Sequence, residues 1–182
     1  MNANKILSLL QIILMKHISL IITLAAFAAL SYGQIPVSHA PIDKEPLLKI
    51  NEDLVGIWKM REDTNYHDYF VVEKRHGYAY SVTYMNRGGD NRTYEHFNAY
   101  LSEVGKMQFL NVQYPGDVYV LLKILSIGRN GFEMTAVAVS NVSLDKVSKP
   151  EEVRKIIEAN INNPSFYKDT LHFRKKLPLH VW

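Results

Sequence analysis

Tyrosines are concentrated in the middle of this 182-residue chain, and their spacing suggests a binding surface. Tyr78, Tyr80 and Tyr84 are separated by even numbers of residues, so they share one face if this segment forms a β-strand. A tyrosine ring combines an apolar body with a polar hydroxyl, which is the combination that small-molecule pockets use. With Phe97 and Phe109 from the following segments, these are the candidate ligand-binding residues. The alternative is an outward aromatic face that stabilises the sheet or contacts a partner protein.

Three histidines raise the question of a metal site. His67, His76 and His96 lie on or beside neighbouring candidate strands, and Asp68 follows the first of them. Imidazole and carboxylate groups suit zinc, but they can converge only if the side chains share one face of the sheet. The simpler interpretation is that these histidines are partly exposed sheet residues. No metal site is therefore predicted.

The common sequence motifs of catalysis and nucleotide binding are absent from the sequence. It has no G-x-S-x-G, no H-E-x-x-H, no phosphate-binding loop and no dinucleotide-binding glycine motif. The chain has no cysteine, which excludes disulfides, thiolate metal sites and a cysteine nucleophile. Its acidic residues show no spacing that marks a catalytic pair. We therefore expect a protein that is not an enzyme and uses no cofactor.

Short β-strands are expected to position these side chains. Segments rich in Val, Ile, Tyr, Phe or Thr, several of them alternating in polarity, indicate strands. They cover residues 54–60, 66–74, 77–86, 92–101, 106–113, 117–126, 131–140 and 170–175. Glycines fall between most of these segments, where hairpin turns favour them. No helical segment separates the first seven strands, so the sequence predicts an all-β antiparallel meander, as in a barrel or a sandwich.

One helix is predicted between the seventh strand and the last one. Ser148 is placed to cap its start, Pro150 suits its first turn, and Glu151 and Glu152 favour the positive end of a helix. The apolar stripe of this helix consists of Val153, Ile156, Ile157 and Ile161. The stripe predicts that the helix packs against the sheet with one face.

Residues 1–33 have the composition of a secretory signal peptide. Lys16 and His17 precede an apolar run at 18–30, and small residues stand just before the predicted cut. As a helix this run would rise about 20 Å, which is too short for a hydrocarbon core of about 30 Å. A second apolar stretch upstream suggests that Met15 is the natural start. The alternative is an uncleaved N-terminal anchor, but we expect cleavage and no stable membrane span afterwards.

The mature chain carries little net charge. Removing residues 1–33 lowers the formal net charge from +3 to +1, because Lys5 and Lys16 are lost. Nucleic acid is therefore not expected as a partner. Residues 34–52 contain three prolines and no clear periodicity, which is typical of an extended leader. We expect an exported protein, periplasmic or extracellular, with its β domain at 53–178.

The first predicted strand carries a motif that resembles the opening of lipocalins and other calycins. Gly56-Ile57-Trp58 is a G-x-W at the start of a mostly antiparallel β chain. The resemblance implies an all-β, lipocalin-like barrel of about eight strands in which Trp58 plugs one end. It also implies that Arg174, from a late strand, packs over the tryptophan ring as a cation–π partner.

A second stretch is similar to the small secreted lipocalin-like proteins of bacteria, in which an F-x-A-x-L strand precedes a glycine turn and an aromatic strand. The matching residues are Phe97, Ala99, Leu101, Gly105 and Phe109. There are two differences from lipocalins: the sequence has no clear T-D-Y second motif, and the strand count before the helix differs. Lipocalins have eight strands before the helix, whereas this sequence predicts seven before it and one after it.

The lipocalin-like resemblance implies a carrier or sensor that binds a small apolar or amphipathic ligand inside the barrel. Burial of apolar ligand surface would drive binding. The alternative is a non-enzymatic structural or interaction module with a filled barrel, which would bind a protein partner through the tyrosine face or the leader. A hydrolase or isomerase on the same scaffold is a third interpretation, and it would require a catalytic cluster.

Overall fold

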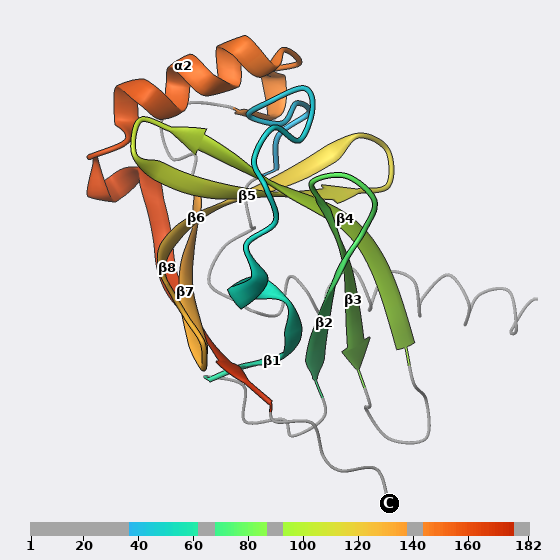
Figure 1. Ribbon diagram of the computed structural model, residues 1–182. Helices are drawn as coiled ribbons and strands as arrows, with labels where there is room; N and C mark the ends of the chain where they lie inside the picture. Colours follow the sequence, from blue (N-terminus) through green and yellow to red (C-terminus); the bar gives the residue numbers. More distant parts are fainter. Residues whose placement is uncertain (1–36, 62–67, 87–92, 138–143, 177–182) are drawn as a thin grey trace, which may run out of the picture. The chain divides into compact units, whose positions relative to one another are not determined.

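The computed structural model describes residues 37–61, 68–86, 93–137 and 144–176, and they form an eight-stranded antiparallel barrel (Figure 1). The strands follow one another in chain order around a closed sheet. They are β1 (Gly56–Met60), β2 (Tyr69–Lys74), β3 (Ala79–Asn86), β4 (Thr93–Val104), β5 (Met107–Tyr114), β6 (Val118–Gly128), β7 (Gly131–Val137) and β8 (Tyr167–Lys175). The predicted fold class is confirmed, including the seven strands before the helix and one after it.

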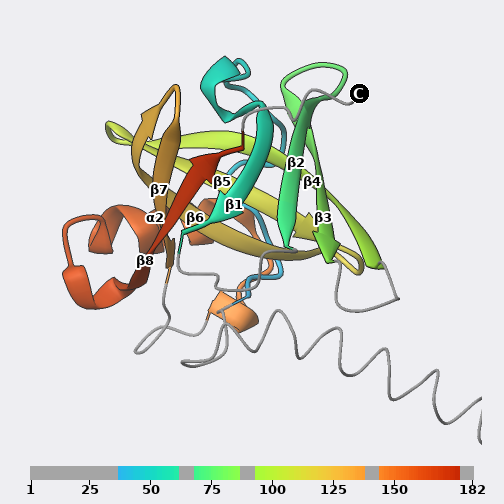
Figure 2. The ribbon, with the colours of Figure 1, turned by 90° about the horizontal axis from the view of Figure 1, so that it is seen from below.

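The barrel closes between its first strand and its last. β1 and β8 are antiparallel, with Trp58 opposite Lys175 and Met60 opposite Phe173. Figure 2 shows these two strands side by side. The strand that follows the helix therefore supplies the eighth member of the barrel.

Side chains alternate between the inside and the outside of the barrel. On β3, Tyr80, Val82 and Tyr84 are buried and alternate with more accessible residues. The register places Ala99 opposite Tyr80 and Phe97 opposite Val82, so these β4 side chains face inward as well. The same alternation makes most of the inward side chains apolar.

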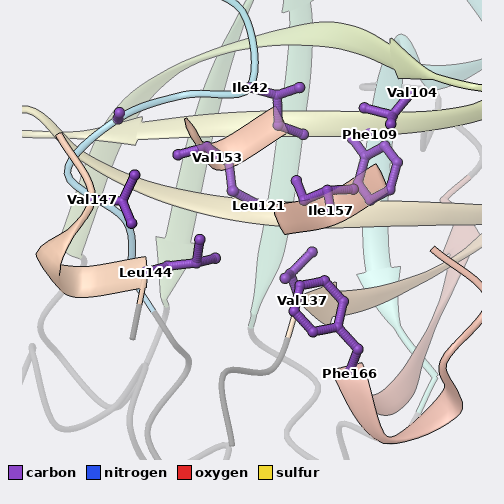
Figure 3. Close-up of a cluster of buried hydrophobic side chains, with 11 residues drawn as sticks. Ile42, Val104, Phe109, Leu121, Val137, Leu144, Val147, Val153, Ile157 and Phe166 are labelled. Carbon is purple, nitrogen blue, oxygen red and sulfur yellow. The ribbon is translucent and has the colours of Figure 1, made fainter. Parts of the chain in front are cut away.

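The helix α2 (Pro150–Asn160) packs against the outside of the barrel, as its apolar stripe predicts. Its N-cap is Lys149, whose extended backbone leads into Pro150, so the predicted cap at Ser148 is one residue too early. Beneath the helix lies a tightly buried cluster, which we call the outer cluster. It consists of Ala40, Ile42, Val104, Phe109, Leu121, Val137, Leu144, Val147, Val153, Ile157 and Phe166. Figure 3 shows most of these side chains pointing toward one another.

Residues 37–43, which we call the strap, cross the outer face beside the helix. Ser38 and Tyr119 exchange two backbone hydrogen bonds of 2.8 Å, and the backbone N–H of Ile42 donates to Asn111 Oδ1 at 2.9 Å. The guanidinium of Arg154, on α2, pairs with Asp43. Part of the segment predicted as an extended leader is thus packed onto the barrel. The predicted signal peptide lies outside the described residues.

Candidate functional site

One end of the barrel is plugged, and Trp58 is the centre of the plug. Its side chain is fully buried, and its indole N–H donates to the backbone carbonyl of Leu54 at 2.8 Å. Leu54 belongs to the short helix η1 (Glu52–Leu54), which leads into β1. The Tyr80 hydroxyl accepts a 2.6 Å hydrogen bond from the N–H of Asn51, just before η1. These contacts tie Trp58 and Tyr80 to the segment that leads into β1.

The cation over Trp58 is Lys175 and not Arg174. The Nζ atom of Lys175 lies 5.2 Å from the centroid of the indole ring. Lys175 is the direct cross-strand partner of Trp58, so both face inward. Arg174 is one residue away, and strand alternation turns it to the outside, where it is exposed and opposite Lys59. The predicted pair of Trp58 with Arg174 is therefore wrong by one position.

A chain of aromatic rings runs along the inside of the barrel from the plug. Trp58 meets Phe132 edge-on at 4.6 Å between centroids, and Phe132 stacks on Phe173 at 4.5 Å. Phe173 contacts Phe70 at 5.8 Å, and Phe70 contacts Tyr84 at 5.2 Å. This chain joins β1, β7, β8, β2 and β3. It gives the interior an aromatic wall that ends at the last residues of β3.

A second aromatic pair stands near the start of β4. Phe97 lies 4.5 Å from Tyr114, centroid to centroid. Glu95 shares the inner face of β4 with Phe97 and is opposite Tyr84 in the register. Burial raises the pKa of the Glu95 carboxyl above its ordinary value. Burial, followed by the repulsion from Glu95, also raises the pKa of Tyr114. This end of the interior thus combines three aromatic rings with one carboxylate.

Several inward side chains keep accessible surface, although their neighbours are apolar. They have intermediate exposure and are Phe70, Val72, Val118, Leu122 and Leu171. Side chains without accessible surface occur both inside the barrel, at Trp58, Tyr80 and Ala99, and in the outer cluster, at Val104, Phe109 and Val153. The inward side chains that keep accessible surface are thus a subset of the barrel interior.

The five predicted ligand-binding residues do not form one site. Tyr84 and Phe97 face the interior away from the plug. Tyr80 also faces inward, but it is fully buried and holds the plugged end. Tyr78 lies in the turn before β3 and is 43% exposed, so its predicted place on the strand is wrong. Phe109 lies in the outer cluster, because its register partner Ser102 belongs to the outer face of β4.

Other interior residues were not among the predicted site residues. Phe70 becomes visible only when the strands are aligned, since it is opposite Tyr84, and Tyr114 only through its contact with Phe97. Alternation alone could have indicated Glu95, which is two residues before Phe97.

The histidines do not come together in the described residues. His76 is exposed in the turn before β3, and His96 lies on the outer face of β4, where Nδ1 is 3.0 Å from the Thr83 hydroxyl. His67 lies outside the described residues. Within the described ranges, no group of three or more potential ligands could hold a metal ion.

A pocket of about 490 Å³ opens beside β3, β4 and β5, and its lining includes Phe97 and Tyr114 of the second aromatic pair. Its lining includes Ser81, Asn98 and Gln113, which form one cross-strand row. Arg75 and Asp117 also line the pocket. Apart from Phe97, Tyr114 and Pro115, the side chains that line the pocket are polar, so it suits a polar or amphipathic partner better than a wholly apolar ligand.

Comparison of the chain with protein-family models, curated proteins and solved structures found no match. Among the described residues, no helix has the length and apolarity required to span a membrane.

Proposed function

We propose that this protein is an exported, lipocalin-like carrier or sensor that holds a small apolar or amphipathic ligand inside the barrel. The observation that carries the proposal is the accessible surface on inward apolar side chains, together with the aromatic chain from Trp58 to Tyr84. An inward side chain keeps accessible surface only where its neighbours leave space, and protein cores are normally filled. The plugged end leaves ligand entry to the opposite end.

A pair of substitutions on β6 separates a hollow barrel from a filled one. Leu122 faces inward and Leu121 faces the outer cluster, so the two residues report on opposite sides of one strand. We expect Leu122→Trp to leave the free energy of unfolding nearly unchanged and to block binding of N-phenyl-1-naphthylamine, an uncharged fluorescent probe. Leu121→Trp should lose about 1–3 kcal/mol of stability through overpacking and keep its probe binding. Equal destabilisation by both changes, without probe binding in the unsubstituted protein, would overturn the proposal.

Native mass spectrometry of the protein taken directly from producing cells would identify a natural ligand class. A small molecule that is retained in the native spectrum and lost on denaturation supports the carrier function. The same sample should lose this mass in the Leu122→Trp variant. Retention in that variant would place the molecule elsewhere on the protein.

The mostly polar pocket favours a second candidate function, an interaction module with a filled barrel. Asn98 lines the pocket and is the central residue of its cross-strand row. If this function holds, Asn98→Arg should abolish capture of a partner, while Leu122→Trp should leave capture intact. The opposite pattern would favour the interior site.

A further inference from the structure

Glu95 is an acidic side chain next to buried apolar residues on the inner face of β4. On β4 it shares this face with Phe97, Ala99 and Leu101, all of which are buried. Its cross-strand partner on β3 is Tyr84. A carboxylate at such a position loses part of its hydration, which costs free energy unless a donor replaces the lost water.

The described part of the chain supplies no such donor. No hydrogen bond or ion pair from a described residue reaches the Glu95 carboxylate. The nearby Asn86 amide donates instead to the Tyr84 hydroxyl, at 3.4 Å. The inward cation Lys175 is engaged with the Trp58 ring at the plugged end. The carboxylate is therefore left to bind something that enters the barrel.

We propose that the ligand carries a protonated amine or a similar cationic head, which binds Glu95 while its apolar tail lies along the aromatic chain toward Trp58. This inference rests on the carrier function proposed above. Three aromatic rings lie at the same end of the interior as the Glu95 carboxylate, those of Phe97, Tyr114 and Tyr84. They would add cation–π attraction to the ion pair. The tail would contact Phe70 and Phe173.

Competition binding of three amphiphiles with twelve-carbon chains and different head groups tests the inference. Dodecylamine, dodecanol and laurate are tested as competitors of N-phenyl-1-naphthylamine at pH 7, with the two ionic compounds below their micelle concentrations and dodecanol below its solubility limit. We expect dodecylamine to bind at least about tenfold more tightly than dodecanol, and laurate to bind most weakly. In Glu95→Gln the preference for the amine should fall to within about threefold of the alcohol, since the charge is lost and the shape is kept.

Glu103→Gln is the matched control. Glu103 lies at the other end of β4 and is exposed, so this variant should keep the amine preference of the unsubstituted protein. Equal competition by all three chains in the unsubstituted protein would overturn the cationic head and leave the carrier function standing. Failure of the probe and of every chain to bind would overturn the carrier function, and this inference with it. An amine preference that survives in Glu95→Gln would show that Glu95 does not bind the head.

Discussion

Lys175 and Trp58 face each other across the seam that closes the barrel. They are direct register partners of β8 and β1, and Nζ of Lys175 lies 5.2 Å from the indole centroid. The seam is thereby joined by side chains as well as by its backbone hydrogen bonds. The lysine and the tryptophan also belong to the plugged end, so seam and plug depend on the same two residues.

Replacing the lysine should weaken the seam measurably. We expect Lys175→Met to lose about 0.5–1 kcal/mol in the free energy of unfolding, because the cation over the ring is removed and the stem is kept. Arg174→Met, on the outer face of the same strand, should change stability by less than about 0.5 kcal/mol. Urea denaturation of both variants checks this. A larger loss for Arg174→Met than for Lys175→Met would contradict this account of the seam.

Removing the tryptophan should have a much larger effect. Trp58 has no accessible surface and packs edge-on against Phe132. Trp58→Ala is expected to cost about 3–5 kcal/mol, the usual range for a buried aromatic side chain. Tyr94→Ala is the comparison on an exposed aromatic residue and should cost far less. A loss below about 1 kcal/mol for Trp58→Ala would show that the plug does not depend on this ring.

The glycine of the G-x-W motif is required by its backbone. Gly56 has a φ of +148°, and an added Cβ would lie 2.6 Å from Cε of Lys175. The lysine can move, but the dihedral angle cannot be adopted cheaply, so Gly56→Ala should cost about 1–3 kcal/mol. Gly128→Ala is the control, because Gly128 has ordinary φ and its nearest contact is at 3.7 Å. Thermal unfolding that ranks the two variants equally would contradict this account.

The buried amide of Asn111 should hold the strap in place. Asn111 Oδ1 accepts from the N–H of Ile42, and Nδ2 donates to the Tyr100 carbonyl and to the Ser102 hydroxyl, at 3.2 and 2.9 Å. Asn111→Ala is expected to lose about 2–3 kcal/mol, because buried polar partners are left unsatisfied. It should also speed proteolysis near residues 37–43. Gln113→Ala, two positions along the same face, should do neither.

Stability should fall at alkaline pH, and Tyr80 should account for part of the loss. Burial raises the pKa of Tyr80 from 10 to about 12. The protonated hydroxyl is favoured in the folded state, so its contribution is complete below pH 10 and is lost as the pH rises toward 12. One such group gives a slope of at most about 1.4 kcal/mol per pH unit. Tyr80→Phe should flatten the profile measured by denaturant unfolding, whereas Tyr94→Phe should not.

The order and type of the elements could be predicted from the sequence, because alternation and turn glycines are local signals. The position of Trp58 at the plugged end could be predicted from the family resemblance. The exact partner could not, since a one-residue difference in register exchanges the inner face for the outer one. Arg174 and Lys175 differ by that single step.

The binding residues were harder to predict because both faces of some strands are buried. On β5, the four consecutive residues from Phe109 to Val112 are all buried, two facing inward and two facing the strap and α2. Alternation in polarity is absent there, so Phe109 could not be assigned to a face from the sequence. Tyr78 shows a different limit, because even spacing has no meaning for a residue that lies in a turn.

The closure of β1 on β8 also determines when this protein can fold. Met60 pairs with Phe173. The second edge of β1 is therefore covered only after β8, near the end of the described residues, has been synthesised. The strap can also dock only late, because its partners Asn111 and Arg154 come much later in the chain. Contacts between such distant residues make folding slow. During synthesis, or after any truncation before β8, the chain would expose two unpaired strand edges that can associate with other chains.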